Sequence, residues 1–382
     1  MKTQLLEALC CPTSGSDLEL EVYASMSEGP AAGVVKTGVL RCATCRTWYP
    51  IVNCVPVMLD FETPLHRHFQ ERHAERLATS AEFTPPRGAP RPGELETQRS
   101  FTTEWSGLVN DELSFSYTER DREDFLRIEL DWPQWPLQRK AYQLLNVGCG
   151  YGLESVLLNR VTGAQVFGVD LNLSLLESGP RVASLPDVHV AIASLYALPF
   201  RKRTFDLVYS HGVLHHTHST RQGFESVLSF LNDTGMIYIW VYGLEDWART
   251  FGLRFSYSVE MLVRPRLARL PTWIQGFWVY PVSLLHFVGY RQDGPNRDKW
   301  HFKNSVHTVR DRWTCRFAYR QSFHEVLAWF LESGLQANPV NSYAYLKRFG
   351  YPLIGVGMRG SRSPANTDAV LMAPESHAPT GG

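Results

Sequence analysis

The sequence has no surplus of charge of either sign, because 38 lysines and arginines balance 38 aspartates and glutamates. Proteins that bind nucleic acids usually show a basic surplus, so a nucleic-acid partner is not expected. The sequence also lacks a signal peptide, since the apolar run at its start is short and is interrupted by Glu7. These absences favour a cytoplasmic location and a partner other than DNA or RNA.

Cysteine is scarce, and its arrangement argues against a small secreted domain that is stabilised by disulfides. The seven cysteines include an adjacent pair, Cys10 and Cys11, and a CxxC pair, Cys42 and Cys45. This spacing indicates metal binding or reduced thiols rather than a framework of disulfides.

Composition divides the chain into four parts. Residues 1–60 form a small module that contains cysteines and short strand-like runs. Residues 61–140 read as a linker and N-terminal extension, because AEFTPPRGAPRPGELETQ is rich in Pro and Gly. Residues 141–360 form the main domain, and the polar, Pro-rich residues 361–382 are predicted to be a disordered tail.

In the main domain, strand-like and helix-like segments alternate. LLNV is followed by the helical LESVLLNRV and then by AQVFGVD, and the alternation continues through VHVAIA, FDLVYS and GMIYIWVY. Such alternation predicts an α/β fold with a mostly parallel sheet that is covered by helices on both faces.

The stretch LLNVGCGYG places Gly148, Gly150 and Gly152 between a predicted strand and a predicted helix. Glycines at this junction let backbone N–H groups approach a ligand closely. The GxGxxG pattern of dinucleotide-binding proteins is not met, because Leu153 occupies the third position. Asp170 ends the next strand and can accept hydrogen bonds from both hydroxyls of a ribose. The alternative is a tight turn without a ligand.

These motifs resemble those of the class I S-adenosylmethionine-dependent methyltransferases. LLNVGCGYG resembles the family's first motif, VFGVDLN the second strand, ASLYALPF the segment beside the adenine, FDLVYSHGVLHH the fourth strand, and LNDTGMIYIWVY the fifth. The resemblance covers about residues 141–245 and 319–360. It implies a Rossmann-like, seven-stranded, mostly parallel sheet and S-adenosyl-L-methionine as the cofactor.

The resemblance also implies a set of cofactor-binding residues. Two of them depart from the family, which commonly has an acidic residue in place of Asn146 and Asp in place of Ser194. Both departures predict weaker cofactor binding rather than its loss. The implied set is Asn146, Gly148, Gly150, Gly152, Asp170, Leu171, Ser194, Leu195 and Ser210.

The N-terminal module resembles the small zinc-ribbon-like activator subunit of tRNA and protein methyltransferases, through CCPTS, RCATC and RTWYPIVNCVPVML. The resemblance implies that Cys11, Cys42 and Cys45 are metal ligands. Ser14 stands where a fourth thiolate is expected, and four thiolates are needed to hold zinc firmly. The sequence therefore predicts substoichiometric zinc or none, in a ribbon that has kept its fold.

Candidates for catalysis follow the fourth and fifth strands, because acceptor groups gather at the carboxyl ends of such strands. His211 is the candidate general base or acceptor-orienting group, with His215 and Tyr242 near it. The alternative for these histidines is packing of the turn. The segment from Asp311, DRWTCRFAYRQSFHEVLAWFLESG, resembles the element that closes the site in bacterial small-molecule methyltransferases, which places Asp311, Trp313 and Tyr319 near the acceptor.

Residues 243–318 form an insertion that is too long for an ordinary connection. Its aromatic run approaches the length of a membrane span but contains Gln275, Pro281 and His286. We expect a helical cap whose aromatic run lines an apolar acceptor pocket, with arginines at its rim. The alternative is peripheral membrane contact through residues 254–290.

The sequence therefore predicts methyl transfer, by in-line displacement, to a small-molecule, glycan or lipid-linked acceptor. Methylation of tRNA or protein is an alternative that the N-terminal module suggests. A scaffold without catalytic activity is a further alternative, prompted by Asn146, Ser194 and the incomplete cysteine set.

Overall fold

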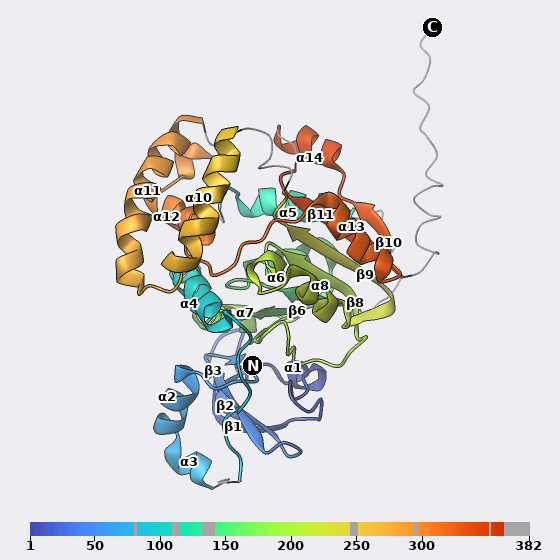
Figure 1. Ribbon diagram of the computed structural model, residues 1–382. Coiled ribbons are helices and arrows are strands. Elements are labelled where there is room, and N and C mark those ends of the chain that lie inside the picture. Colours follow the sequence, from blue (N-terminus) through green and yellow to red (C-terminus); the bar gives the residue numbers. More distant parts are fainter. Residues whose placement is uncertain are drawn as a thin grey trace.

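The computed structural model describes residues 1–79, 82–108, 113, 115–131, 142–244, 251–293, 296–350 and 353–362. Figure 1 shows a central sheet, a small blue module beside the N-terminus and a helical lobe at the opposite end of the molecule. The predicted disordered tail falls almost entirely on residues 363–382, which lie outside the described residues.

The N-terminal module is a four-stranded antiparallel sheet preceded by one short helix, as predicted. Its core includes Leu40, Tyr49 and Ile51, which are fully buried. The chain then joins the main sheet, where the backbone N–H of Met58 donates to the carbonyl of Ile192 at 2.7 Å. The elements are α1 (Thr3–Ala8), β1 (Glu19–Ser25), β2 (Val35–Cys42), β3 (Thr47–Val52) and β4 (Val55–Pro56).

The segment expected to be a linker and extension contains four helices in its described part. The Pro- and Gly-rich run ends at Gly93, and α4 begins directly after it. Helix α5 begins at a capping box in which the Thr118 hydroxyl accepts from the N–H of Asp121 at 3.2 Å. The helices are α2 (Pro64–Arg72), α3 (Ala74–Ala78), α4 (Glu94–Trp105) and α5 (Glu119–Leu130).

The main sheet has seven strands in the order β10-β11-β9-β8-β5-β6-β7. Strands β5 to β9 are parallel, whereas β11 is antiparallel to both of its neighbours. The predicted fold class is therefore confirmed. The strands are β5 (Gln143–Val147), β6 (Gln165–Asp170), β7 (Val188–Ile192), β8 (Phe205–His211), β9 (Leu231–Val241), β10 (Gln336–Pro339) and β11 (Val356–Ser361).

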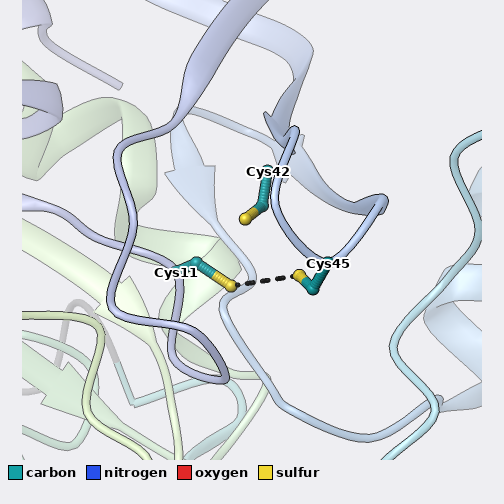
Figure 2. A group of neighbouring side chains, drawn as sticks. All are labelled: Cys11, Cys42 and Cys45. Carbon is teal, nitrogen blue, oxygen red and sulfur yellow. Dashed lines mark hydrogen bonds between the residues drawn. The ribbon is translucent and has the colours of Figure 1, made fainter.

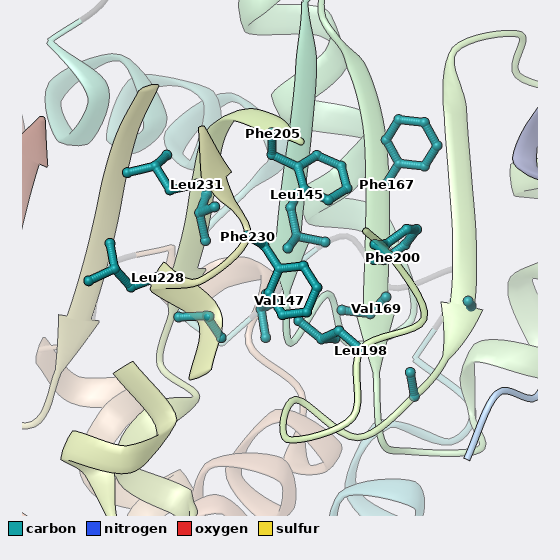
Figure 3. Packing of buried hydrophobic residues seen from close by; sticks show 14 of the residues in the cluster. Leu145, Val147, Phe167, Val169, Leu198, Phe200, Phe205, Leu228, Phe230 and Leu231 are labelled. Carbon is teal, nitrogen blue, oxygen red and sulfur yellow. The ribbon is translucent and has the colours of Figure 1, made fainter. Parts of the chain in front are cut away.

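Both faces of the sheet are buried beneath helices. Leu144 points to one face and packs in a cluster with Leu157 of α6, whereas Leu145 points to the other. Figure 3 shows that second face, where Leu145 lies among Phe205, Phe230 and other apolar side chains. The helices of the main domain are α6 (Leu153–Thr162), α7 (Leu175–Ala183), α8 (Thr220–Leu228), α13 (Phe323–Glu332) and α14 (Ser342–Phe349), with the 3₁₀ turn η1 (Leu214–His216).

The insertion is helical, as predicted, and forms the lobe seen at the upper left of Figure 1. Glu260, which is fully buried, joins its parts by ion pairs with Arg312 at 2.7 Å, Arg264 at 3.2 Å and Arg320 at 3.3 Å. Within the described chain, no helix has both the length and the apolar content that crossing a membrane requires. The elements are α10 (Phe251–Leu267), α11 (Thr272–Asp293), η2 (Arg297–Lys299) and α12 (Phe302–Trp313).

Candidate active site and cofactor cavity

A cavity of about 430 Å³ lies at the carboxyl ends of the parallel strands. The glycine loop and Asp170 form one side of it, and His211 and Tyr242 form another. The remaining walls come largely from helices, among them α4, α5 and α12. Their lining residues include Glu94, Phe101, Trp105, Arg122, Thr308 and Asp311.

The glycine loop has the backbone conformation that glycine alone adopts easily. Gly148, Gly150 and Gly152 have φ values of 83°, 60° and 93°. A Cβ atom on Gly148 would lie 2.0 Å from a methyl group of Val213. Gly148 and Gly150 line the cavity, whereas Gly152 is the N-cap of α6 and faces Val182. The loop therefore offers backbone to a ligand at two of the three predicted positions.

Asp170, the predicted ribose-binding residue, ends β6 beside the glycine loop. Its Oδ2 accepts from the N–H of Gly150 at 2.7 Å, and its Oδ1 accepts from the N–H of Asn172 at 2.9 Å. Burial raises the pKa of Asp170, and these backbone hydrogen bonds oppose that rise. Asp170 and its neighbour Leu171 both line the cavity. These residues fit the nucleoside part of S-adenosylmethionine.

The cavity wall beside Ser194 contains an acidic residue that the sequence interpretation missed. Leu195, a predicted cofactor-binding residue, lines the cavity, but Ser194 is buried and does not reach it. Glu94, the first residue of α4, lines the cavity, and burial raises its pKa while a hydrogen bond from Ser194 opposes this rise. Its Oε2 also accepts from the N–H of Arg91 at 2.7 Å. A carboxyl group is thus present beside Ser194.

Two other predicted cofactor-binding residues do not reach the cavity. Asn146 is fully buried, and its Nδ2 donates to Ser155 Oγ at 3.0 Å on the neighbouring helix α6. Ser210 is also fully buried. The cavity wall is formed instead by their neighbours Val147 and His211, because successive side chains of a strand point to opposite faces.

His211 lines the cavity and is paired with a buried carboxylate. Its Nδ1 lies 3.0 Å from Oε1 of Glu129, and its ring stacks on Trp240 with centroids 4.6 Å apart. Glu129 is fully buried on α5, and its Oε2 accepts from the Tyr209 hydroxyl at 2.8 Å. Burial alone would raise the pKa of Glu129, but His211 and Arg122 hold it below its usual value. Glu129 is therefore a charged partner that orients the imidazole of His211.

His215, the second predicted catalytic histidine, does not line the cavity. It is fully buried, and its ring stacks on Tyr242 with centroids 3.8 Å apart. Burial lowers the pKa of His215 well below its usual value, so it is neutral. The structure thus corrects its assignment to catalysis, since the residue packs the turn, and the cavity is reached by the next residue, His216.

Tyr242 lines the cavity and belongs to a second polar group. Its hydroxyl donates to Asp311 Oδ2 at 2.6 Å, and Asp311 Oδ1 lies 3.5 Å from Nε2 of His216. Burial alone would lower the pKa of His216, but Cys315 and Asp311 raise it to about 10. A tyrosine, a carboxylate and a cationic histidine therefore hold α12 to the strand ends.

Of the three residues expected near the acceptor, Asp311 reaches the cavity and the other two do not. Trp313 packs against Trp278, with ring centroids 5.4 Å apart. The backbone N–H of Tyr319 donates to the carbonyl of His215 at 2.9 Å. Phe317 of the same segment also lines the cavity.

The aromatic run of the insertion does not line the cavity, so that expectation is wrong. Trp273 and Phe277 on α11 are 71% and 77% exposed. The apolar wall is built by α4 instead, through Phe101 and Trp105, with α12 beside it. The expected arginine rim is also absent from the described part of α10, where Arg264 is buried against Glu260.

The cysteine module brings three sulfur atoms together, as Figure 2 shows. The Sγ atoms of Cys11, Cys42 and Cys45 all lie within 4.8 Å of one another. The Ser14 hydroxyl lies 3.2 Å from Cys42 Sγ, at the fourth corner. Three thiols fit three positions of a tetrahedral zinc site, and a hydroxyl occupies the place where a thiolate would complete it.

Replacing Ser14 by Cys is expected to give a protein that binds one zinc ion per chain tightly. The native chain is expected to contain substoichiometric zinc or none, because a neutral hydroxyl is a poor ligand. Elemental analysis of both purified proteins, after dialysis against a chelator, measures the difference. Thr13→Cys, one position away, is the control. Equal and stoichiometric zinc in the native protein and in Ser14→Cys would contradict the expectation.

Comparison with known proteins places these sites in families. Residues 145–239 match the model of a methyltransferase domain, and residues 2–53 match that of a Trm112p-like protein. The glycine loop, Asp170 and the central strands of the open sheet accordingly lie in a segment that matches a methyltransferase domain. More particularly, the chain carries a methyltransferase domain behind a Trm112p-like domain.

Three solved structures illustrate the range of similar folds. One chain comes from a complex that contains the Haloferax volcanii Trm112 methyltransferase activator, with 13% identity, 64% of this chain and 93% of that chain covered, and a TM-score of 0.37. Another is Burkholderia thailandensis 1,6-didemethyltoxoflavin-N1-methyltransferase, with 14% identity, 72% and 92% covered, and a TM-score of 0.39. Haemonchus contortus phosphoethanolamine N-methyltransferase 2 is 16% identical, with 73% and 61% covered and a TM-score of 0.40.

Proposed function

We propose that this enzyme methylates a small, largely apolar molecule at a hydroxyl or amine that must lose a proton. The observation that supports this is His211, paired with Glu129 and exposed to a cavity with aromatic walls. When bound, S-adenosylmethionine supplies an electrophilic methyl group on a sulfonium. The chain's own task is to align the acceptor with that group, exclude water and accept a proton.

The cofactor would lie along the glycine loop. Gly148 and Gly150 would meet its amino-acid part, Asp170 its ribose hydroxyls, and Leu195 its adenine. Glu94 would take the place of the aspartate that the family commonly has at Ser194, with its carboxyl oxygen accepting from the adenine amino group. All these residues line one continuous cavity, and this continuity supports the assignment.

His211 would act as the general base. With Nδ1 facing Glu129, its Nε2 is the nitrogen available to take a proton from the acceptor. The negative charge of Glu129 stabilises the imidazolium that forms, and burial strengthens this effect because water does not screen it. Proximity of the aligned groups contributes roughly 7–11 kcal/mol in reactions of this type.

The aromatic walls of the cavity indicate the class of acceptor. Phe101, Trp105, Trp240 and Tyr242 present aromatic surface, so a planar or apolar acceptor with one polar group fits best. A protein or tRNA acceptor is a second candidate, favoured by the match of residues 2–53 to the Trm112p-like model. The balanced charge of the chain argues against tRNA.

A direct test incubates the full chain with methyl-labelled S-adenosylmethionine and a panel of phenols, aromatic amines and aliphatic alcohols. Label should enter an aromatic hydroxyl or amine compound, and not a protein or tRNA fraction. Cofactor binding is first checked by calorimetry, so that a failure to bind is separated from an incomplete panel. Label entering only a protein or tRNA fraction would contradict the small-molecule proposal.

Replacing Glu94 by Gln is expected to weaken binding of S-adenosylhomocysteine by roughly 2- to 12-fold, or about 0.5–1.5 kcal/mol, because a neutral amide oxygen is a weaker acceptor than a carboxylate. The adenine amino group should account for this loss. The variant should therefore bind S-inosylhomocysteine, which lacks that group, as well as the native chain does. Calorimetry with both ligands measures this difference.

The matched control is Glu96→Gln on the same helix, because Glu96 does not line the cavity. If Glu94→Gln weakened the binding of both ligands equally, Glu94 would stabilise the turn at Arg91 and would not bind the adenine.

A further inference from the structure

Helix α11 presents an apolar stripe to the solvent. Trp273, Phe277, Tyr280, Leu284 and Val288 follow one another at intervals of three or four residues, so they share one face of the helix. They are 71%, 77%, 53%, 55% and 53% exposed, in that order. Isolated exposed apolar residues are normal, but a row of this length marks an interaction surface.

The opposite face of α11 is buried against the lobe and carries polar residues as well as the fully buried Val279. Gln275 and Ser283 are buried, and the Gln275 Nε2 donates to the carbonyls of Leu267 and Leu270 at 3.2 and 3.1 Å. His286 Nδ1 lies 3.1 Å from Ser305 Oγ on α12. This buried face attaches α11 to the lobe, and the apolar stripe is left for an external partner.

Basic residues stand at both ends of the stripe. Among the described side chains of residues 255–303, the exposed acidic residue is Asp298, whereas six exposed residues are basic. This excess is complementary to a negatively charged surface, and it disfavours pairing of two copies of α11, whose basic ends would approach each other. The six are Arg266, Arg269, Arg291, Arg297, Lys299 and Lys303.

We propose that the apolar stripe of α11 docks on the surface of an anionic lipid bilayer. The helix would lie in the plane of the interface, with its aromatic and aliphatic side chains in the acyl boundary and the basic residues among the headgroups. Gln275, Ser283 and His286 keep its other face on the protein. The inference does not depend on methyl transfer, because it rests on residues that lie outside the cavity.

Docking would also bring the cavity close to the bilayer. Helix α12 contacts α11 through Ser305, and its Thr308 and Asp311 line the cavity one turn further along. One helix therefore separates the proposed lipid surface from the site, and an amphiphilic acceptor taken from the bilayer would have a short path to it.

Sedimentation with vesicles tests the proposal on the full chain. The native protein should sediment with phosphatidylcholine vesicles that contain 30 mol% phosphatidylglycerol, and much less with pure phosphatidylcholine. Phe277→Glu combined with Leu284→Glu should lower the partition coefficient at least tenfold. The control, Leu331→Glu combined with Tyr343→Glu, changes two exposed residues on α13 and α14 and should bind as the native chain does. Calorimetry with S-adenosylhomocysteine verifies that each variant is folded.

Three results would overturn the proposal. The first is native protein that stays in the supernatant with anionic vesicles at low salt. The second is a partition coefficient that the α11 variant and the control variant lower equally. The third is a native dimer, seen by light scattering, that Phe277→Glu with Leu284→Glu converts to monomers, because the stripe would then be covered by a second copy.

Discussion

Replacing His211 by Gln is expected to lower turnover by roughly 10²- to 10⁴-fold, the usual contribution of a general base. Gln is close to histidine in size but cannot accept a proton at neutral pH. Affinity for S-adenosylmethionine should remain nearly unchanged, because the glycine loop and Asp170 keep their geometry. Release of S-adenosylhomocysteine measures the rate, and calorimetry measures the affinity.

Glu129 provides the partner variant for this experiment, because it touches His211 and not the cavity. If Glu129 orients the imidazole of His211 and stabilises its protonated form, Glu129→Gln alone should slow turnover. Added to His211→Gln, it should cause little further loss, because residues that act as a unit are not additive. His324→Gln, an exposed histidine on α13, is the control and should leave the rate unchanged.

Unchanged turnover in His211→Gln would contradict its role as base. The pair formed by Tyr242 and Asp311 would then be the next group to test, since Asp311 accepts from the tyrosine hydroxyl at 2.6 Å and both line the cavity. Losses that simply multiply in the double variant would show that Glu129 supports the fold of α5 rather than the imidazole.

The predicted cofactor-binding residues that line the cavity are those that one local motif specifies. Gly148, Gly150 and Asp170 lie on a strand–loop–helix–strand unit, in which spacing alone places the glycines beside the end of the next strand. Leu195 follows from the same logic on the strand after that. The order of the motifs along the chain was also sufficient to predict the seven-stranded sheet.

Residues supplied by helices before the sheet could not be predicted in this way. Glu94 and Glu129 lie on α4 and α5, in a segment without a motif, and they reach the site only through tertiary packing. The sequence contained one indication of these residues, because Glu94 and Glu129 are each separated from aromatic residues by intervals that place them on one face of a helix. Nothing in the sequence connects that spacing to a particular strand end.

The direction of a side chain was the other source of error. His215 and Asn146 have suitable chemistry, but each points into the packed interior. Helix α11 is apolar around most of its circumference, so periodicity does not tell which face meets the protein. In the structure, Gln275, Val279 and His286 lie on the side that meets the protein, whereas Trp273 and Phe277 are exposed.

Asp170→Ala is expected to weaken binding of S-adenosylmethionine by about 1.5–3 kcal/mol, the usual value for hydrogen bonds to a charged group, which corresponds to roughly 13- to 160-fold. Calorimetry measures the change directly and requires no acceptor. Asp187→Ala is the control, because this exposed aspartate lies at the other end of the sheet, directly before β7.

Asp170 has a second role that the experiment must separate from the first, because its carboxylate also accepts from the backbone of Gly150 and Asn172. Asp170→Ala could therefore weaken binding by loosening the glycine loop. A cofactor analogue without the ribose 2′-hydroxyl distinguishes the two roles. If the carboxylate binds the ribose, the native chain should prefer the natural cofactor to the analogue, and Asp170→Ala should bind both about equally. A preference that persists in Asp170→Ala would assign the residue to the loop alone, and an unchanged affinity would remove it from the cofactor site.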